Sequence, residues 1–432
     1  MLRVLERLGG AGHRSWLVGG VVRDLLVGRR RPDPAEFDVA TPATPAEVAP
    51  LFRRVVPTGI EHGTVTVLEG GCRIEITTFR GEGPYEDGRR PSSVTFHTDL
   101  EADLARRDFT MNALAWDPLP GTAGEFRDPF GGVADIRRRI IRAVGDARAR
   151  FEEDGLRPLR AVRFAAQHGA RLERRTRAAI APALPVVRRV SRERVAEELS
   201  RLLVAPHADR GIALLAETGL LDALFPGLEP LSPGVRRHAV AVASAPFRAA
   251  AADPERLRTL RLAGLLHPLA PAEARQEILA LRLPNRAGDG VRDLLAAGPC
   301  MGERTDPLPR RPADVRRWLS GVGPGRAEDL LALWAADASH QGARARRLGA
   351  AVRALRRRVA TVLASRPPLA TGDLALGGRE VMAVLGTGGP AVGEALRHLL
   401  DLVLEEPARN ERAALESALR SWSARGPFPR PA

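Results

Sequence analysis

Residues 15–28 read SWLVGGVVRDLLVG and organise the start of the chain. The apolar run 15–18 is typical of a short buried strand, and the run 21–27 is typical of a helix that ends at a glycine. The glycine turn between them, which contains Gly20, offers free backbone N–H groups, and Arg23 adds a positive charge. Such a turn can hold phosphates, or it can simply connect a strand to a helix.

The next predicted strand carries two acidic residues. Residues 36–41, EFDVAT, alternate with a period of two, which places the carboxylates of Glu36 and Asp38 on one face. Adjacent carboxylates repel each other unless a divalent cation lies between them, so both are candidate metal ligands. The alternative is a pair of solvated surface acids. Asp33 stands nearby as a substitute ligand, although its odd offset from Asp38 places it on the other face of an extended strand.

A hairpin follows the acidic strand. Residues 64–68 and 73–79 are β-rich runs that flank the glycine pair 70–71, and both glycines accept positive φ. Glu75 lies between two isoleucines and points away from them, so it is the candidate for a third acid at the site. A solvated surface position is the other interpretation of Glu75.

The pattern changes after about residue 140 to helical periodicities separated by proline and glycine breaks. We therefore predict an α+β fold in which a small mixed sheet with helices precedes a long all-α region. No stretch approaches the roughly 18 uninterrupted apolar residues of a membrane span, and the start lacks the pattern of a signal peptide. We expect a cytoplasmic protein with no membrane association and no obligate protein partner.

Charge and composition narrow the classes further. Across 432 residues, 66 basic side chains face 52 acidic ones, for a formal charge of +14, and every basic residue is arginine. This excess suits a polyanionic partner such as RNA, although a GC-rich genome gives the same arginine bias. The absence of lysine excludes a Walker A loop, and two cysteines are too few for a disulfide scaffold or a cysteine-based zinc site.

Four motifs, in this order and spacing, resemble the class II tRNA nucleotidyltransferase family of the polymerase-β type. They are LVGGVVRDLL (17–26), EFDVATPATPAEV (36–48), ARRDFTMNALAWDP (105–118) and RFEEDGLRPLRAVRFAAQ (150–167). This family includes CCA-adding enzymes, A-adding and CC-adding enzymes, and bacterial poly(A) polymerases. The resemblance implies a nucleotidyltransferase head (1–140), a neck with a nucleobase-template helix (141–204), a helical body (205–300) and a tRNA-binding helical tail (301–432).

The resemblance also implies a two-metal mechanism. In the family the acids after the glycine turn bind two Mg²⁺ ions, and Glu36 and Asp38 occupy those positions here. The ions would assist an in-line attack of the RNA 3′-hydroxyl on the nucleotide α-phosphate, with pyrophosphate as the leaving group. The family usually has aspartate where this chain has Glu36, whose longer side chain requires an adjustment to meet the strict octahedral geometry of Mg²⁺.

Nucleotide-binding residues are implied in the same way. Gly20 and Arg23 belong to the phosphate-binding turn, and Arg107 is expected to contact the incoming nucleotide. Arg160 and Arg163 are expected to complete the nucleotide site through phosphate or sugar. A surface ion pair for Arg107 and a plain basic helix face for the other two remain the alternatives. Asp108 and Asn112 are expected to brace the junction between head and neck.

Asp154 and Arg157 are expected to read the nucleobase. They lie three residues apart, which places them on one side of a helical turn, and Pro158 indicates that the helix begins near Asp154. A carboxylate accepts from the exocyclic amino group of cytosine or adenine, and a guanidinium donates to the adjacent ring nitrogen. Uracil and guanine present the opposite pattern. The family pattern usually has proline at the position of Gly155, which places the local geometry in question.

Residues 81–91 and 262–268 each support a further prediction. Residues 81–91 form a long charged loop that contains the only tyrosine, Tyr85, and a loop here in the family is needed to add the terminal A. Its presence argues against a CC-adding enzyme, unless it is a generic long loop. Residues 262–268 lie where some relatives carry a His-Asp phosphohydrolase domain. Pro268 replaces the aspartate expected after His267, and we expect no other metal-ligand set there, so we predict a degenerate remnant.

The sequence therefore predicts a template-independent enzyme that builds or repairs the 3′-terminal CCA of tRNA from CTP and ATP, with Mg²⁺ as cofactor. A dedicated A-adding enzyme or poly(A) polymerase shares every motif and remains an alternative. A catalytically impaired RNA-binding protein is an alternative from another class, motivated by Glu36.

Overall fold

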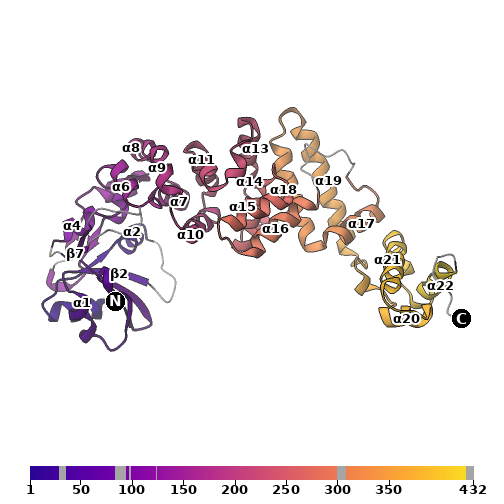
Figure 1. Ribbon diagram of the computed structural model, residues 1–432, viewed down its shortest axis with the longest axis horizontal. Coiled ribbons are helices and arrows are strands. Elements are labelled where there is room, and N and C mark those ends of the chain that lie inside the picture. Colours follow the sequence, from indigo (N-terminus) through magenta and orange to yellow (C-terminus); the bar gives the residue numbers. More distant parts are fainter. Residues whose placement is uncertain (29–35, 83–93, 97–98, 123, 299–307, 425–432) are drawn as a thin grey trace. The chain divides into compact units, whose positions relative to one another are not determined.

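The computed structural model describes residues 1–28, 36–82, 94–96, 99–122, 124–298 and 308–424 (Figure 1). The chain divides into two compact units. The first comprises Met1–Ser232 and Gln276–Asn285, and the second comprises Pro233–Arg275 and Arg286–Ala432. Within the described ranges, no helix is both long enough and apolar enough to cross a membrane. The α+β class is confirmed, and the four-part domain boundaries stay a prediction.

The first unit is built on a mixed seven-stranded sheet. Strand β2 (Glu36–Thr41) pairs antiparallel with β1 (Trp16–Val18) and parallel with β5 (Cys72–Thr78), and β5 pairs antiparallel with β4 (Thr64–Glu69). In sheet order the strands are β3 (Val55–Gly59), β4 (Thr64–Glu69), β5 (Cys72–Thr78), β2 (Glu36–Thr41), β1 (Trp16–Val18), β8 (Ala115–Trp116) and β9 (Phe126–Arg127). The acidic strand β2 is therefore central.

The predicted hairpin is present. Gly70 and Gly71 join β4 to β5 with φ angles of 56° and 75°, a left-handed pair that places glycine at both central positions. Two short sheets complete the strands of this unit: β6 (Arg80–Glu82) with β7 (Val94–Phe96), and β10 (Ile140–Ile141) with β11 (Arg171–Leu172).

Helices cover the sheet and then form the remainder of the first unit. They are α1 (Leu2–Gly10), α2 (Gly20–Leu26), α3 (Pro45–Val48), α4 (Leu100–Ala105), α5 (Gly132–Arg138), α6 (Ala147–Glu153), α7 (Arg157–His168), α8 (Arg174–Ala178), α9 (Ile180–Val187), α10 (Arg192–Leu203), α11 (Ala208–Glu217) and α12 (Leu220–Leu224). The sequence expectation of a strand, glycine turn and helix at 15–28 corresponds to β1 and α2.

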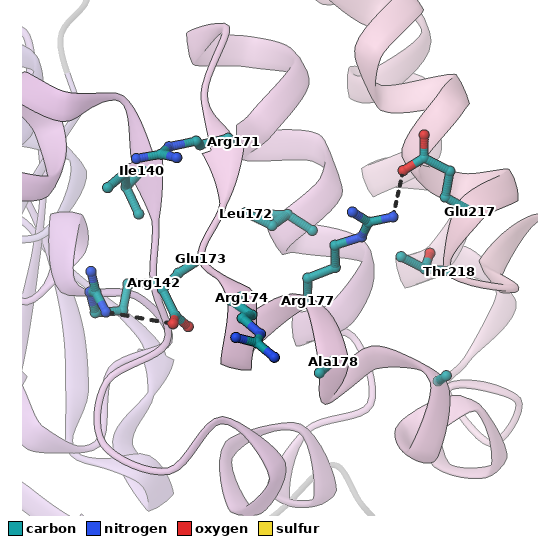
Figure 2. A pocket seen from close by; sticks show the side chains of 11 residues that line it. Ile140, Arg142, Arg171, Leu172, Glu173, Arg174, Arg177, Ala178, Glu217 and Thr218 are labelled. Carbon is teal, nitrogen blue, oxygen red and sulfur yellow. Dashed lines mark hydrogen bonds and ion pairs between the residues drawn. The ribbon is translucent and has the colours of Figure 1, made fainter.

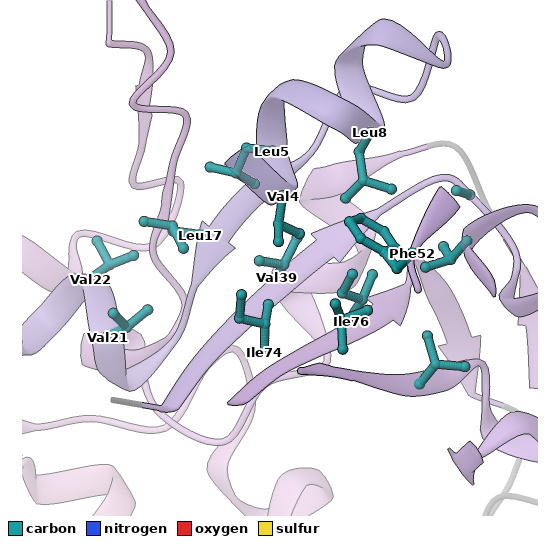
Figure 3. Close-up of a cluster of buried hydrophobic side chains, with 14 of the residues drawn as sticks. Val4, Leu5, Leu8, Leu17, Val21, Val22, Val39, Phe52, Ile74 and Ile76 are labelled. Atoms are coloured by element: carbon teal, nitrogen blue, oxygen red, sulfur yellow. The ribbon is translucent and has the colours of Figure 1, made fainter. Parts of the chain in front are cut away.

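Alternation along the strands separates two cores. Figure 3 shows one face of the sheet, where Val39, Ile74 and Ile76 pack against the buried side chains of α1. Residues of the opposite parity, including Val18 and Ala40, belong to a second cluster on the other face. Because Asp38 has the parity of Ala40, its carboxylate lies on the face opposite the α1 cluster.

After Ser232, the described chain is helical. The helices are α13 (Pro233–Ala243), α14 (Pro254–Leu266), α15 (Pro271–Ala280), α16 (Asn285–Ala296), α17 (Pro312–Val322), α18 (Pro324–Ser339), α19 (Ala345–Ala364), α20 (Gly378–Leu385), α21 (Pro390–Glu405) and α22 (Arg412–Ser423). The last three share their own buried cluster of leucine, valine and alanine. Most of these helices begin with proline at the first position, where its missing N–H costs nothing.

Candidate active site

The glycine turn closes tightly against the sheet. Gly19 precedes α2 with a φ of 70°, and its N–H donates to the carbonyl of Leu114 at 3.1 Å. A Cβ at this position would lie 2.9 Å from Nη1 of Arg107. Glycine is therefore required both by the backbone conformation and by the close approach of an arginine.

Arg23 projects from α2 into a buried position. Its Nη1 donates to Oδ1 of Asn112 at 2.6 Å, and its Nη2 donates to Oδ1 of Asp24 at 2.9 Å. Its guanidinium also lies 5.5 Å from the centre of the Phe164 ring. The side chain is thus held in place by three neighbours, with its charge directed towards the glycine turn.

Three acids lie on neighbouring strands. Asp38 of β2 is in register with Glu75 of β5, and Glu36 lies two residues earlier on β2. All three residues are exposed. Partial burial of its carboxyl group raises the pKa of Glu75, and the negative charges of Asp38 and Glu36 raise it further. The expectation that Glu75 shares the face of Asp38 is confirmed, while Asp33 lies outside the described residues.

This group of oxygen donors fits a hard divalent cation. Mg²⁺ binds carboxylate oxygens and keeps several of its waters, which suits exposed acids on adjacent strands. The mutual repulsion that raises the pKa of Glu75 is the kind of cost that a cation would relieve.

Asp38 opens onto a cleft of about 440 Å³ in the first unit. Glu36 is not among its described lining residues. The cleft is lined by Gly19, Gly20, Arg23, Asp38, Arg107, Asp108, Asn112, Asp154, Arg157, Arg160, Arg163, Phe164 and Arg201. Six of these side chains are arginines and three are aspartates, so the lining carries a net charge of +3. The structure thus brings together eight of the nine predicted site residues.

A chain of ion pairs crosses the floor of the cleft. Nη2 of Arg160 lies 2.7 Å from Oδ2 of Asp108, and Nε of Arg163 lies 2.5 Å from Oε2 of Glu198. Arg160 also reaches Glu198 at 3.3 Å. Asn112 donates to Asp108 at 3.0 Å, and Asp108 in turn pairs with Arg160 of α7, which is the contact expected of a brace at the junction of head and neck.

The pKa of Asp108 is lowered. Burial on its own would raise this pKa, but the charge of Arg160 and hydrogen bonds from Asn112 and Arg160 outweigh it. A carboxyl group with a lowered folded pKa stabilises the fold above its unfolded pKa, and that contribution is lost as the pH falls through the folded pKa.

We therefore expect Asp108→Asn to lower the free energy of unfolding at pH 7 by roughly 1–3 kcal/mol. The difference from the parent protein should shrink as the pH falls below about 4, because the unfolded aspartate takes up a proton there while the folded carboxyl stays ionised. Urea denaturation at several pH values measures it. Asp209→Asn, at an exposed position in α11, is the control and should change the free energy of unfolding at pH 7 by far less. An equal loss at every pH would contradict the ion-pair explanation.

The expected helical geometry of Asp154 and Arg157 is wrong. Asp154 has extended backbone angles of −137° and 107° and lies between two helices, because α7 begins only at Arg157. Pro158 occupies the first turn of α7, so the proline did indicate a helix start. The predicted start near Asp154 was about one turn too early. Oδ1 of Asp154 accepts from the N–H of Leu156 at 3.0 Å. Both side chains nevertheless line the cleft.

Each of the two residues has its own partner. Oδ2 of Asp154 accepts from Nη2 of Arg194 at 2.9 Å. Nη1 of Arg157 donates to Glu153 at 2.6 Å and to the carbonyl of Arg150 at 2.9 Å, and its Nη2 donates to the carbonyl of Arg106 at 3.2 Å. These contacts fix the two groups independently.

Sequence reasoning missed the contribution of α10. Arg194, Glu198 and Arg201 are spaced i, i+4 and i+7 along this helix, which places them on one face. The first holds Asp154, the second joins Arg160 and Arg163, and the third lines the cleft. That spacing of charged residues was the available signal.

The structure accounts for glycine in place of the usual proline at position 155. A Cβ on Gly155 would lie 2.6 Å from the carbonyl oxygen of Val186 and 2.7 Å from its carbon. Any side chain here would collide with the backbone of α9.

We expect Gly155→Ala to lower the free energy of unfolding by about 1–3 kcal/mol, because α9 must shift to admit the methyl group. Thermal denaturation measures this change. Gly9→Ala, in α1, is the control, since nothing lies within 4 Å of the added carbon. That variant should be neutral or slightly stabilised. A Gly155→Ala protein as stable as its parent would show that α9 yields without cost.

A second cavity, of about 620 Å³, lies between β10, β11 and α8 (Figure 2). Four arginines are among its lining residues, which are Ile140, Arg142, Arg171, Leu172, Glu173, Arg174, Arg177, Ala178, Ala181, Glu217 and Thr218. Figure 2 shows Arg177 paired with Glu217, which lies at 2.9 Å. Arg171 and Arg174 are exposed, and no ion pair joins them to another described residue.

Two other predictions concern the long loop at 81–91 and the region around His267. The long loop, with Tyr85, lies almost wholly outside the described residues. The expectation that the region around His267 offers no other metal-ligand set is wrong, because His238 and Asp337 lie beside it. These residues come from separate helices, so no spacing of nearby residues in the sequence reveals that they lie together.

The fold and the cleft together define a class of protein, the nucleotidyltransferases. A glycine turn, an acidic strand and an arginine-lined cleft lie on one mixed sheet, an arrangement that suits a nucleoside triphosphate. Comparison with known proteins narrows this class. Residues 15–142 match the family model described as the poly A polymerase head domain, and residues 169–231 match the probable RNA- and SrmB-binding site of polymerase A.

Full-length relatives specify the family. A CCA-adding enzyme of Geobacillus stearothermophilus is 40% identical over 95% of this chain and 94% of its own length. One from Geobacillus thermodenitrificans is 38% identical over 98% and 96%. The crystal structure of the Bacillus stearothermophilus CCA-adding enzyme in complex with CTP superposes with a TM-score of 0.74 at 35% identity, covering 98% of this chain and 96% of that one. This chain belongs to the CCA-adding enzyme family, whose reaction is typically metal-dependent.

Proposed function

We propose that this protein adds or repairs the 3′-terminal CCA of tRNA, using CTP and ATP and releasing pyrophosphate, and that it acts in the cytoplasm. The observation that carries the proposal is the cleft, which gathers residues from the glycine turn, the acidic strand and α7 around a net positive lining. A triphosphate is the ligand whose charge such a lining matches.

Asp38, with Glu75 and Glu36 beside it, would hold Mg²⁺. When bound, the ions supply positive charge to the triphosphate and lower the pKa of the RNA 3′-hydroxyl. Arg23, held by Asn112, and Arg107, beside Gly19, neutralise the phosphates.

The transfer itself needs no protein nucleophile. The 3′-oxygen of the RNA forms a bond to the α-phosphorus while the bond to the pyrophosphate oxygen breaks, and the hydroxyl proton passes to solvent. The chain's contribution is to orient the two reactants and to balance the charge that moves onto pyrophosphate.

Asp154 and Arg157 read the base through the hydrogen bonds they have left. An ionised carboxylate offers about four lone-pair sites, and Asp154 uses two of them on Leu156 and Arg194. A guanidinium has five N–H groups, and Arg157 spends three on Glu153 and on two backbone carbonyls. Among the described residues, one N–H on Nη2 and the Nε–H have no partner, which suits an acceptor nitrogen of cytosine or adenine.

Incubation with single nucleotides tests the proposal. With Mg²⁺, tRNA that lacks CCA should gain cytidine from CTP alone, and tRNA that ends in CC should gain one adenosine from ATP alone. UTP and GTP should give little extension. Incorporation of ATP without CTP would instead identify an A-adding enzyme or a poly(A) polymerase, and tRNA binding without any extension would identify an impaired RNA-binding protein.

We further propose that the cavity of Figure 2 contacts tRNA phosphates. The double variant Arg171→Ala with Arg174→Ala should weaken tRNA binding and reduce the slope of log K against log salt by about 1 for each phosphate that an arginine no longer neutralises. Filter binding over a salt series measures this. Arg148→Ala removes an exposed arginine that already pairs with Glu152, and is the control. An unchanged slope in the double variant would place the tRNA elsewhere.

A further inference from the structure

Three potential metal ligands meet in the second unit, away from the residues described above. His238 lies in α13, His267 follows the last residue of α14, and Asp337 lies in the last turn of α18. One ligand atom from each lies within 4.8 Å of the other two. The three helices pack against one another (Figure 1), so the cluster joins segments that are far apart in sequence.

The carboxylate of Asp337 is fully buried and only half satisfied. Its Oδ1 lies 2.6 Å from Nε2 of His238 and accepts from Nε2 of Gln341 at 2.9 Å. Its Oδ2 is buried and has no hydrogen-bond partner among the described residues. Burying an acceptor without a partner costs free energy, and a bound ligand at this oxygen would remove that cost. A simple His–Asp hydrogen bond explains Oδ1 but leaves Oδ2 unexplained.

The surroundings orient the other ligands. The carbonyl of Gly264 can only accept, so Nδ1 of His267 donates to it at 2.8 Å, and in the neutral ring Nε2 then carries the lone pair. A backbone carbonyl on one ring nitrogen is a common arrangement for a histidine that binds a metal through the other. A Cβ on Gly264 would lie 2.8 Å from Cα of Ala243, so glycine allows α13 and α14 the close approach that brings the two histidines together.

We propose that His238, His267 and Asp337 bind one divalent transition-metal ion of the zinc class. Two imidazole nitrogens and one carboxylate oxygen suit Zn²⁺ and its neighbours, whereas Mg²⁺ and Ca²⁺ prefer oxygen ligands alone. Three protein ligands leave a coordination position for water, and the partly exposed side chain of His238, at 22%, gives that position access to solvent. Bound metal ties α13, α14 and α18 together.

Zinc binding by the full-length protein tests this proposal. Metal-stripped protein is titrated with Zn²⁺ in excess Mg²⁺, which occupies oxygen-only sites in the head. We expect one Zn²⁺ per chain, a higher melting temperature with zinc, and a visible absorption spectrum of mixed nitrogen and oxygen coordination when Co²⁺ replaces Zn²⁺.

Two variants locate the site. Asp337→Asn keeps the shape of the side chain. Asp337→Asn and His267→Gln, each made as a single variant, should each weaken zinc binding by at least about 100-fold. The control is His398→Gln, because His398 stacks on Trp422 in the same unit and lies outside the cluster. If circular dichroism shows that His267→Gln does not fold, Asp337→Asn decides. A parent protein that binds no Zn²⁺, or an Asp337→Asn protein that binds as tightly as the parent, overturns the proposal.

Discussion

Asp38→Ala is expected to lower the addition of nucleotides to tRNA by roughly 10²–10³-fold or more. Among the described residues, Asp38 is the acid that both lines the cleft and lies in register with a second carboxylate, that of Glu75. In the proposed mechanism Asp38 holds a metal ion, so its removal takes away positive charge that balances the triphosphate. Single-turnover extension of tRNA at saturating CTP measures the loss, and nucleotide binding without Mg²⁺ should change far less.

Two further variants give this prediction its controls. Glu69→Ala removes a carboxylate from β4 of the same sheet, outside the cleft, and should leave extension unchanged. Glu36→Asp restores the residue that the family usually carries and should alter the rate by less than about tenfold, because either carboxylate can supply an oxygen to Mg²⁺. Extension that survives Asp38→Ala would refute the metal assignment. A sharp rise from almost no activity in Glu36→Asp would show that the natural chain is impaired.

Local pattern was sufficient to predict the strand, glycine turn and helix at 15–28, the acidic strand and the following hairpin. The apolar run at β1, the alternation of β2 and the glycine pair 70–71 each obey rules that act over a few residues. The face shared by Asp38 and Glu75 followed from the same period of two, because neighbouring strands keep their parity across the sheet.

Contacts between residues far apart in the sequence could not be predicted from local pattern. Asp154 was placed on a helix because Pro158 indicates a helix start, but the hydrogen bond from Leu156 holds Asp154 in extended backbone before that start. Its partner Arg194 lies on α10, and only the packing of α10 against α7 brings the two together. The cluster at His238 was missed for the same reason, because its members lie on or directly after three separate helices.

Asp154→Ala and Arg157→Ala are each expected to erode the preference for CTP over UTP by roughly 5- to 150-fold, since a mispaired polar group in a pocket costs about 1–3 kcal/mol. The reason is the pair of hydrogen-bond patterns: a carboxylate meets the amino group of cytosine, and a guanidinium meets its ring nitrogen. Uracil reverses both patterns. Competition between CTP and UTP on one tRNA lacking CCA measures the ratio directly.

Neighbouring variants separate reading of the base from support of the fold. Arg157 also ties α6 to the third motif through two backbone carbonyls, so Arg157→Ala should lose stability as well as selectivity. Asp154→Asn should keep stability but gain UTP use, because an amide can donate to the carbonyl that a carboxylate repels. Arg194→Ala frees Asp154 without removing it, so its effect on selectivity should be smaller than that of Asp154→Ala. If both alanine variants fold and still exclude UTP and GTP as the parent does, other groups of the cleft must select the base. Asp154 and Arg157 would then have only a structural role.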